Sequence, residues 1–463
     1  MTRRDILFCA LLLLLAGGLR GYQLSQPGGH IFDEWGYARD ACSYLGLGEQ
    51  TCGVSAEVTD VHPPLGKWLI AAGIGILGNN PIGWRVPSAL AGIITVGLLY
   101  LLTRRLTGST LAAVVAAGML AFDPLSIVSS RVAMLDVFTA CAGVAAVLFV
   151  VLERDAIAAS VSRPRSLRRP WLAATGIAGG CAIATKWSGA LVLVTVVVLV
   201  VLFEVAAARR GGRAAWSAFA AGPAIGVWLV VAPAVVYAAS YIGRLDATLI
   251  AIPWQDGAWP RELVERQLFM LRFHVGLEGA HPYASPAWAW LLGKRPVLFY
   301  FDIDGAGRYR EILALANPFL WIPGLLCAVA AGVSAVRGRR LFAAEAVVAA
   351  AAAGAFLPWL LLTAGRSFVF LYYVLPTVPF LALALGWATI RLAGVARPAM
   401  ATGVFVIAVT AVLFWQPLIY GHWLDYDTWR QRILFVDCTP SEITDGRLTP
   451  RFRGPPPPGW CWV

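Results

Sequence analysis

The sequence predicts an all-α membrane protein that crosses the bilayer many times. Of its 463 residues, 59% are hydrophobic and only 14% are charged, and the mean hydropathy is +0.70. Soluble domains have a clearly lower apolar fraction. Several stretches also match the roughly 20 apolar residues that a helix needs to cross a hydrocarbon core. We therefore expect one polytopic helical bundle.

We expect about eleven membrane-spanning helices in this bundle. They are predicted at residues 6–19, 87–102, 111–122, 133–152, 171–185, 190–203, 216–239, 318–336, 342–362, 368–389 and 399–417. Residues 70–77 are also apolar, but this segment is short and rich in glycine. Its length favours an interfacial or re-entrant position over a full crossing.

The arginine clusters predict how these spans are oriented. Arg3 and Arg4 precede the first span, and with eleven spans the other compact arginine clusters fall on the same side. Because cytoplasmic loops are enriched in Lys and Arg, we expect a cytoplasmic N-terminus and an outer C-terminus in the cell membrane. The net charge of +11 comes from these clusters, so no nucleic-acid partner is predicted.

This topology divides the chain into three parts. Residues 1–315 form a first module with two long outer loops, at about 24–69 and 241–313. Residues 316–420 form a region of four spans, and residues 421–463 form an extracytoplasmic tail.

The first outer loop concentrates ionisable side chains beside the bilayer. Asp33 and Glu34 open the polar stretch, and Asp60, His62 and Lys67 close it. Such groups are costly next to a membrane and usually mark a functional site. We therefore predict that acid–base chemistry takes place in this loop, on the outer face of a membrane enzyme.

No nucleotide-binding motif accompanies this loop. The sequence has no G-x-x-x-x-G-K-[ST] and no G-x-G-x-x-G after a strand. An enzyme that works on the outer face cannot easily draw on cytosolic nucleotide sugars. A donor linked to a lipid and carried in the bilayer would solve this problem of supply.

Four of the eight cysteines fall on the predicted outer side, where disulfides can form. Cys42 and Cys52 lie in the first outer loop, and Cys438 and Cys461 lie in the tail. The local pairings are Cys42–Cys52 and Cys438–Cys461, although four cysteines allow three connectivities.

Several motifs, in order along nearly the whole chain, resemble those of the protein O-mannosyltransferases. They are F-D-E at 32–34, D-V-H-P-P-L-G-K at 60–67, R-V-A-M-L-D at 131–136, A-T-K-W-S-G at 184–189, H-P-Y-A-S at 281–285, A-N-P at 316–318 and Y-Y-V-L-P at 372–376. The second outer loop is too short for the β-trefoil insertion of eukaryotic members, so the pattern resembles a bacterial, actinobacterial-type form.

The resemblance implies a GT-C-type glycosyltransferase fold and a defined reaction. The donor would be polyprenyl-phosphate-mannose, the acceptors would be Ser and Thr hydroxyls of exported proteins, and the sugar carbon would be inverted. The resemblance implies no metal and no other cofactor, and we expect none. Membrane lipid and the secretion translocon are the other partners that we expect.

Transfer of a sugar from a phosphate to a hydroxyl needs a base near the hydroxyl and positive charge near the phosphate. We predict that Asp33 is the base and that Glu34 orients or hydrogen-bonds nearby, because adjacent side chains point in different directions. The alternative is that Asp33 only caps a helix that runs from about Glu34 to Leu45.

Three cations are candidates for the donor phosphate: Arg131, Lys186 and Arg366. A guanidinium suits bidentate phosphate contacts, but side chains at the ends of spans can also simply snorkel to the interface. Asp136 is expected to neutralise a neighbouring cation, with Arg131 as one candidate.

The remaining candidates have two possible roles each. Asp60, His62 and Lys67 either contact substrate or shape the loop, because two prolines after His62 restrict the backbone. His281, Tyr283 and Trp288 either line a wall for sugar and acceptor or belong to an aromatic belt at the interface.

Three alternative functions remain open at this stage. The first is another GT-C transferase that uses a polyprenyl-phosphate sugar and acts on lipid or cell-wall glycan. The second is a transporter or flippase, which would show ionisable residues near the bilayer centre and internal repeats. The third is an assembly subunit of the export machinery, which would not need the acidic pair.

Overall fold

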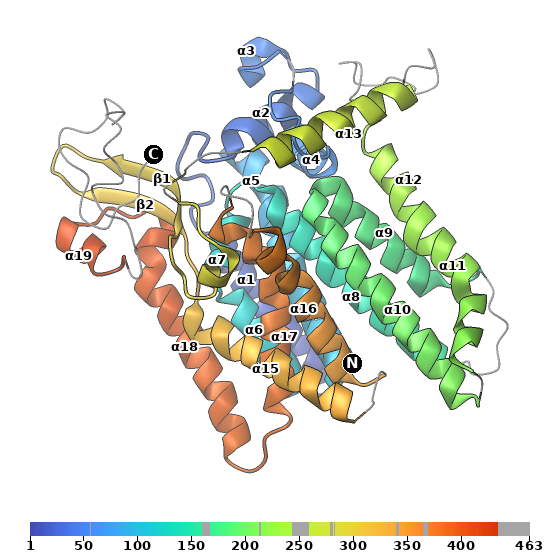
Figure 1. Ribbon diagram of the computed structural model, residues 1–463. Helices are drawn as coiled ribbons and strands as arrows, with labels where there is room; N and C mark the ends of the chain where they lie inside the picture. Colours follow the sequence, from blue (N-terminus) through green and yellow to red (C-terminus); the bar gives the residue numbers. More distant parts are fainter. Residues whose placement is uncertain are drawn as a thin grey trace.

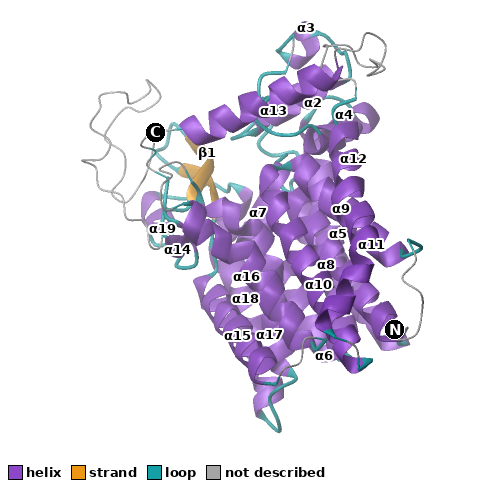
Figure 2. Ribbon diagram, turned by 45° about the vertical axis from the view of Figure 1, so that its right-hand side comes forward, coloured by secondary structure: helices purple, strands orange, loops and turns teal. Residues whose placement is uncertain are grey.

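The structure is a computed structural model that describes residues 1–433, except for 56, 160–166, 213, 243–258, 278–280, 282, 339–341 and 364–368. Within this part the chain is mostly α-helical, with one two-stranded sheet. Long helices run side by side, and short helices and the sheet gather toward one end of the bundle (Figure 1; Figure 2). The predicted all-α membrane fold is confirmed.

The first part of the bundle contains seven helices. They are α1 (Arg3–Gly21), α5 (Pro81–Thr107), α6 (Thr110–Ala121), α7 (Pro124–Ser130), α8 (Leu135–Ala159), α9 (Pro170–Thr185) and α10 (Ala190–Arg210). Helix α5 packs against α1 and α8, and α8 also packs against α9. The side chain of Asn80 caps α5 by accepting two backbone N–H groups, and Gly108 ends the helix in the left-handed conformation.

The crossing predicted at residues 111–122 corresponds to α6, and a sharp bend follows it. Helices α6 and α7 meet at an angle of 59°. The break has a local cause, because the Asp123 side chain accepts the backbone N–H of Ser126 and Pro124 occupies the first helical turn. A new helix therefore starts at Pro124, and its end places Arg131 next to the start of α8.

The number of spans agrees with the expected eleven when the shorter helices are included. In the described part of the chain, eight helices are long and apolar enough to cross a membrane, and the α6–α7 pair would be a ninth. Helix α1, which is charged at both ends, and α9, which has 16 residues, supply the other two. Helix α4 (Leu65–Leu77) contains the short apolar segment at residues 70–77 and has only 13 residues, fewer than a full crossing needs.

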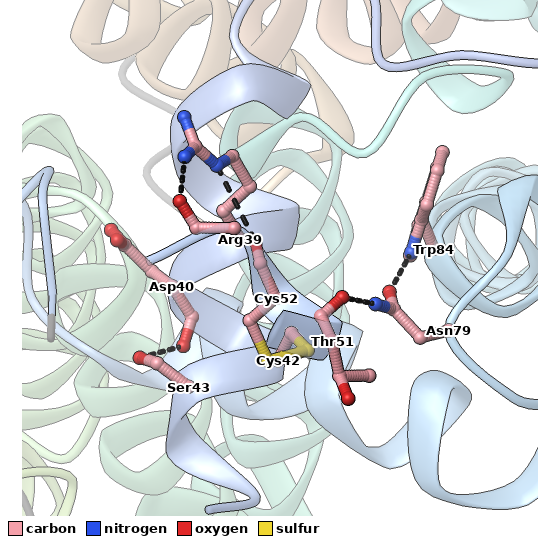
Figure 3. The surroundings of a disulfide bond; sticks show 9 residues. Arg39, Asp40, Cys42, Ser43, Thr51, Cys52, Asn79 and Trp84 are labelled. Carbon is pink, nitrogen blue, oxygen red and sulfur yellow. Dashed lines mark hydrogen bonds between the residues drawn. A yellow bond between two sulfur atoms is a disulfide. The ribbon is translucent and has the colours of Figure 1, made fainter. Parts of the chain in front are cut away.

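The first outer loop folds into two short helices before α4. They are α2 (Glu34–Tyr44) and α3 (Glu49–Cys52). A disulfide between Cys42 and Cys52 joins them, with the two Cα atoms 5.5 Å apart (Figure 3). The predicted Cys42–Cys52 pairing is confirmed, whereas Cys438 and Cys461 lie outside the described residues.

The next span and the second outer loop follow α10. The span consists of η2 (Ala215–Ala221), α11 (Gly222–Gly226), η3 (Val227–Val231) and α12 (Ala232–Ala239). The loop contains α13 (Trp259–Gly276), α14 (Ala287–Trp290) and an antiparallel hairpin of β1 (Val297–Ile303) and β2 (Tyr309–Ala314). Helix α13 lies across the end of the bundle, close to α2 and α4 (Figure 1).

The last part of the chain contains the four predicted spans. They are α15 (Pro318–Arg337), α16 (Ala344–Leu362), the 3₁₀ segment η4 (Leu371–Thr377) continued by α17 (Val378–Thr389), and α18 (Ala396–Tyr420). A short helix, α19 (Tyr426–Arg430), follows. Helix α17 is the most enclosed of these spans and packs between α6 and α15.

Candidate active site

Asp33 lies at the N-terminus of α2, but its side chain does not cap the helix. Its backbone carbonyl accepts the N–H of Tyr37 at 2.9 Å, while the carboxylate makes no capping hydrogen bond. The alternative of a merely capping role is therefore wrong. The carboxylate instead hydrogen-bonds with the phenol of Tyr37, one helical turn away.

Phe32 fixes the approach to Asp33. It is a bulky residue with φ of 45°, a backbone conformation that is strained for any residue with a Cβ. Its ring stacks on Phe299 of β1, with ring centroids 4.4 Å apart, and meets Tyr372 edge-on at 5.5 Å. This packing holds the strained turn, so the β1–β2 hairpin and η4 together position Phe32 and, through it, Asp33.

The surroundings of Asp33 favour its protonated form more than water does. Burial raises the pKa of Asp33 to about 6, although the charge of Lys186 and the hydrogen bond with Tyr37 act in the opposite direction. The nearby Asp136 carboxylate adds to the increase. A carboxylate with a pKa near 6 can accept a proton from a hydroxyl more readily than an ordinary aspartate.

Lys186 and Asp136 form a buried ion pair beside Asp33. Lys186 follows the last residue of α9 in an extended conformation, which directs it toward the first turn of α8. Its Nζ lies 2.9 Å from both carboxylate oxygens of Asp136. Tyr373 packs against the same ammonium group, with 4.5 Å from Nζ to the ring centroid. The residue that Asp136 neutralises is thus Lys186 and not Arg131, as one candidate pairing had it.

Glu34 does not share the site with Asp33. It is fully buried, and its carboxylate makes two 2.8 Å contacts with Arg85 of α5. The same carboxylate accepts the backbone N–H groups of Ile31 and Ala133. Glu34 therefore holds the loop on α5 and on the α7–α8 connection. These contacts are those of the orienting, hydrogen-bonding residue that the sequence predicted.

Arg85 is a site-forming residue that the sequence reasoning missed. Besides Glu34, its guanidinium donates to the carbonyls of Leu24, Pro27 and Gly29, so one side chain ties down the first half of the outer loop. One signal in the sequence could have pointed to it: Arg85 is a charged residue at the start of an apolar span, two positions before Pro87. Its partner could not be read from the sequence.

Arg131 is also engaged with the protein backbone. Its guanidinium donates to the carbonyls of Arg20, Tyr22 and Gln23 at the C-terminal end of α1, and it lies 4.5 Å from the Tyr420 ring centroid. A cation is favourable at a helix C-terminus. Arg131 therefore anchors the end of α1. Its contact with the donor phosphate stays a prediction. Arg366 lies outside the described residues.

The second half of the first outer loop is held by ion pairs. Lys67 is fully buried, with Nζ 2.9 Å from Asp40 and 2.7 Å from Glu57. Asp60 pairs with Arg266 of α13 at 2.6 Å. Lys67 and Asp60 therefore shape the loop, which is one of the two roles that the sequence left open.

His62 lies between the acid and α13. Its ring centroid is 5.9 Å from that of Tyr37 and 5.5 Å from that of His274 on α13. His274 in turn contacts the carbonyl of Val61 at 2.9 Å and lies 5.9 Å from Trp187, the neighbour of Lys186. The His62 ring therefore packs on aromatic residues that border Asp33 and Lys186.

Of the three residues predicted to form an aromatic wall in the second outer loop, two are packed in the protein and one is exposed. His281 packs edge-on against Phe370 at 4.9 Å, and Phe370 contacts Tyr372 and Tyr373 beside Lys186. Tyr283 is buried next to His281, and burial raises its pKa. Trp288 is 56% exposed, so it does not pack into this group.

No three His, Cys, Asp or Glu side chains gather as a metal-binding group in the described part of the chain. Metal independence remains a prediction. What the structure brings together is one carboxylate with a raised pKa, one cation held by a second carboxylate, and a rim of tyrosines.

The fold is that of a membrane-embedded glycosyltransferase of the GT-C type. The structure matches one chain of the Saccharomyces cerevisiae protein O-mannosyltransferase Pmt1–Pmt2 complex bound to the sugar donor, with a TM-score of 0.76 and 14% identity, over 94% of this chain and 92% of that chain. It also matches ArnT from Cupriavidus metallidurans bound to undecaprenyl phosphate, with a TM-score of 0.54 and 18% identity, over 88% of this chain and 64% of that one.

The sequence narrows this class to one family. The profile of dolichyl-phosphate-mannose-protein mannosyltransferases matches residues 78–242, and the profile of the C-terminal four-span region of protein O-mannosyltransferases matches residues 260–437. The polyprenol-phosphate-mannose–protein mannosyltransferase of Mycobacterium tuberculosis is 31% identical over 78% of this chain and 75% of its own length. The corresponding protein of Corynebacterium glutamicum is 28% identical over 91% of both. The chain belongs to the protein mannosyltransferase family.

Proposed function

We propose that the chain transfers mannose from polyprenyl-phosphate-mannose to Ser or Thr hydroxyls of exported proteins, with inversion at the sugar carbon. The observation that carries this proposal is the Asp33 carboxylate, uncommitted to its helix, beside the Lys186–Asp136 pair. The names of the mycobacterial and corynebacterial relatives support the choice of donor and of protein acceptors.

The proposed reaction uses Asp33 as the base and Lys186 as the cation for the leaving phosphate. The acceptor oxygen attacks the anomeric carbon, its proton passes to Asp33, and the bond from that carbon to the phosphate oxygen breaks. Lys186 has three N–H donors, of which two face Asp136, so one remains for the departing phosphate. Its charge stabilises the polyprenyl phosphate that leaves. A single displacement of this kind inverts the sugar carbon.

The tyrosine rim suits the substrates of this reaction. Tyr37, Tyr372 and Tyr373 surround the acid and the cation, and each offers an aromatic face and a hydroxyl. Aromatic faces pack on apolar surfaces while the hydroxyls hydrogen-bond. The rim can thereby exclude water, which would otherwise compete with the acceptor hydroxyl.

We propose that this site faces the outside of the cell membrane. Arg3 and Arg4 open α1, and α5, α10 and α15 each have arginines in their last turns. The N-terminus lies at the end of the bundle opposite α2 (Figure 1), and the positive-inside rule makes that end cytoplasmic. The Cys42–Cys52 disulfide at the other end suits an oxidising compartment. Labelling of single engineered cysteines with an impermeant maleimide in whole cells tests this orientation.

The transfer assay separates the proposal from its nearest alternative. Purified protein receives radiolabelled polyprenyl-phosphate-mannose and either a Ser/Thr-rich peptide or a lipid or cell-wall glycan acceptor. We expect label in the peptide as an α- or β-glycoside opposite in configuration to the donor. Label only in the glycan would support the alternative transferase.

The same assay tests the absence of a metal requirement. We propose that Lys186 supplies the positive charge that a divalent cation would otherwise provide. Full transfer after exhaustive EDTA treatment is expected. Loss of transfer that Mg²⁺ or Mn²⁺ restores would show that a metal takes part.

A further inference from the structure

A pocket lies away from the candidate active site. Its volume is about 340 Å³, which is within the range of small-molecule sites. Three segments build it: the turn after α1, strand β2 and the turn after α18. The residues that matter for its chemistry are Gln23, Gln26, Arg310, Tyr420, His422 and Trp423. Neither Asp33 nor Lys186 belongs to it.

The walls of this pocket are held firmly. Gln23 adopts φ of 47°, which is uncommon for a residue with a side chain. Its carbonyl accepts a hydrogen bond from Arg131, and its side-chain oxygen lies 3.3 Å from His422 Nε2. The hydroxyl of Tyr420 donates to the carbonyl of Leu19 at 2.9 Å. A strained backbone kept in place by its surroundings is typical of ligand sites.

The backbone also fixes Trp423. The next residue, Leu424, exchanges two backbone hydrogen bonds of 2.7 and 2.8 Å with Tyr309 of β2. Trp423 packs against the guanidinium of Arg310, whose centre lies 4.6 Å from the ring centroid. The pocket is thus a preformed space with an indole on one side and amides on another.

The charges around the pocket favour a neutral ligand. Arg310 pairs with Asp302 at 2.9 Å and with the hydroxyl of Tyr300 at 2.6 Å, so its charge is largely neutralised. Its Nε is nevertheless buried without a hydrogen-bond partner in the described part of the chain. The guanidinium of Arg131 is occupied by backbone carbonyls. An anion would therefore find little uncompensated charge, whereas a polar neutral molecule would find donors and acceptors.

We propose that this pocket binds a neutral hexopyranose. The C–H face of a pyranose ring can pack on the indole of Trp423, as apolar groups do on aromatic faces. The amide of Gln26 carries both donors and an acceptor, and the amide nitrogen of Gln23 carries two donors, which suits neighbouring sugar hydroxyls. The Gln23 amide oxygen and both ring nitrogens of His422 already lie within 3.3 Å of polar partners, so they hold the wall of the pocket in place. Sugar binding at this site does not depend on the proposed transferase function; only a glycosylated acceptor as the source of the sugar rests on it.

The sugar can come from two sources: a free saccharide or a sugar already attached to an acceptor protein. The β1–β2 hairpin connects the pocket with the active site, since Arg310 of β2 lines the pocket and Phe299 of β1 stacks on Phe32 beside Asp33. A glycosylated acceptor could therefore contact both sites through one rigid element. The ring chemistry is the same in either case.

The binding test uses the full-length protein in detergent micelles and methyl α-D-mannopyranoside as the probe, with saturation-transfer NMR as the readout. A ligand of this size should bind with a dissociation constant on the order of 1 mM. Trp423→Ala should weaken binding by about tenfold. Gln23→Asn keeps a residue type that tolerates positive φ but withdraws the amide, and it should weaken binding in the same direction.

The control is Trp216→Ala, which removes an equally large aromatic residue, 73% exposed in η2, and should leave sugar binding unchanged. Tighter binding of a mannosylated peptide than of the glycoside would identify acceptor proteins as the source, and equal affinities would identify free sugar. Unchanged binding in both pocket variants, absence of binding to the wild type, or displacement of the sugar by inorganic phosphate would overturn the proposal. If Trp423→Ala does not fold, Gln23→Asn alone decides.

Discussion

Replacing Asp33 by asparagine should abolish the proposed base and stabilise the protein at the same time. Burial holds the pKa of Asp33 at about 6, whereas an aspartate in the unfolded chain has the ordinary value of 3.8. Between these two values the folded state binds more protons than the unfolded state, so stability falls as the pH rises. Above pH 6 the cost is constant. A neutral asparagine of the same shape does not incur it.

The size of this effect follows from the two pKa values. A difference of about 2 pKa units corresponds to at most about 3 kcal/mol of unfolding free energy at pH 8, and to about half of that at pH 5. The assay is thermal unfolding of wild type and Asp33→Asn in the same detergent at both pH values. Asp33→Asn should unfold at a higher temperature, with the larger difference at pH 8. A variant that is less stable than wild type, or equally stabilised at both pH values, would refute the reasoning.

Four further predictions concern pH, charge and the outer loop. Transfer by the wild type should fall about tenfold per pH unit below pH 6, because the base must be deprotonated; a flat profile from pH 7 to 5 would contradict this. Lys186→Met should lower kcat by about 10²–10³ and, because it leaves the Asp136 carboxylate buried without its cation, should also lower the unfolding temperature; an unchanged kcat would exclude Lys186 from phosphate stabilisation. Arg85→Met leaves the Glu34 carboxylate buried without its cation and should cost about 3–5 kcal/mol of stability, measured by thermal unfolding; a wild-type unfolding temperature would exclude a positioning role. Replacement of Cys42 and Cys52 by serine should cost about 3 kcal/mol, because the bridge closes a loop of ten residues; equal stability with and without reductant in the wild type would argue against it.

The membrane spans were predictable from the sequence for a physical reason. Apolar length decides whether a segment can cross a bilayer, and that length is a local property. Apolar length also predicts the end of one span at Phe122, but it does not predict that a new helix, α7, starts at Pro124 at 59° to α6. The Asp-Pro signal for that start is local too, but it is a helix cap, and hydropathy does not register caps.

The partners of the charged residues were not predictable. Glu34 and Arg85 are 51 positions apart, and Asp136 and Lys186 are 50 apart. Which cation meets which carboxylate depends on how α5, α8 and α9 pack, and hydropathy does not determine that. Arg131 was predicted as a phosphate ligand because it is a cation near the predicted outer end of a span. The structure assigns it to the C-terminal carbonyls of α1, an environment that only the packed bundle creates.

The central claim is that Asp33 accepts the proton of the acceptor hydroxyl. Its most direct test is single-turnover transfer of mannose from polyprenyl-phosphate-mannose to a Ser/Thr peptide by wild type and Asp33→Asn, with donor binding measured on the same preparations. We expect the variant to bind the donor as tightly as wild type and to transfer mannose about 10²–10⁴ times more slowly. Transfer at the wild-type rate by a variant that binds donor normally would contradict the account.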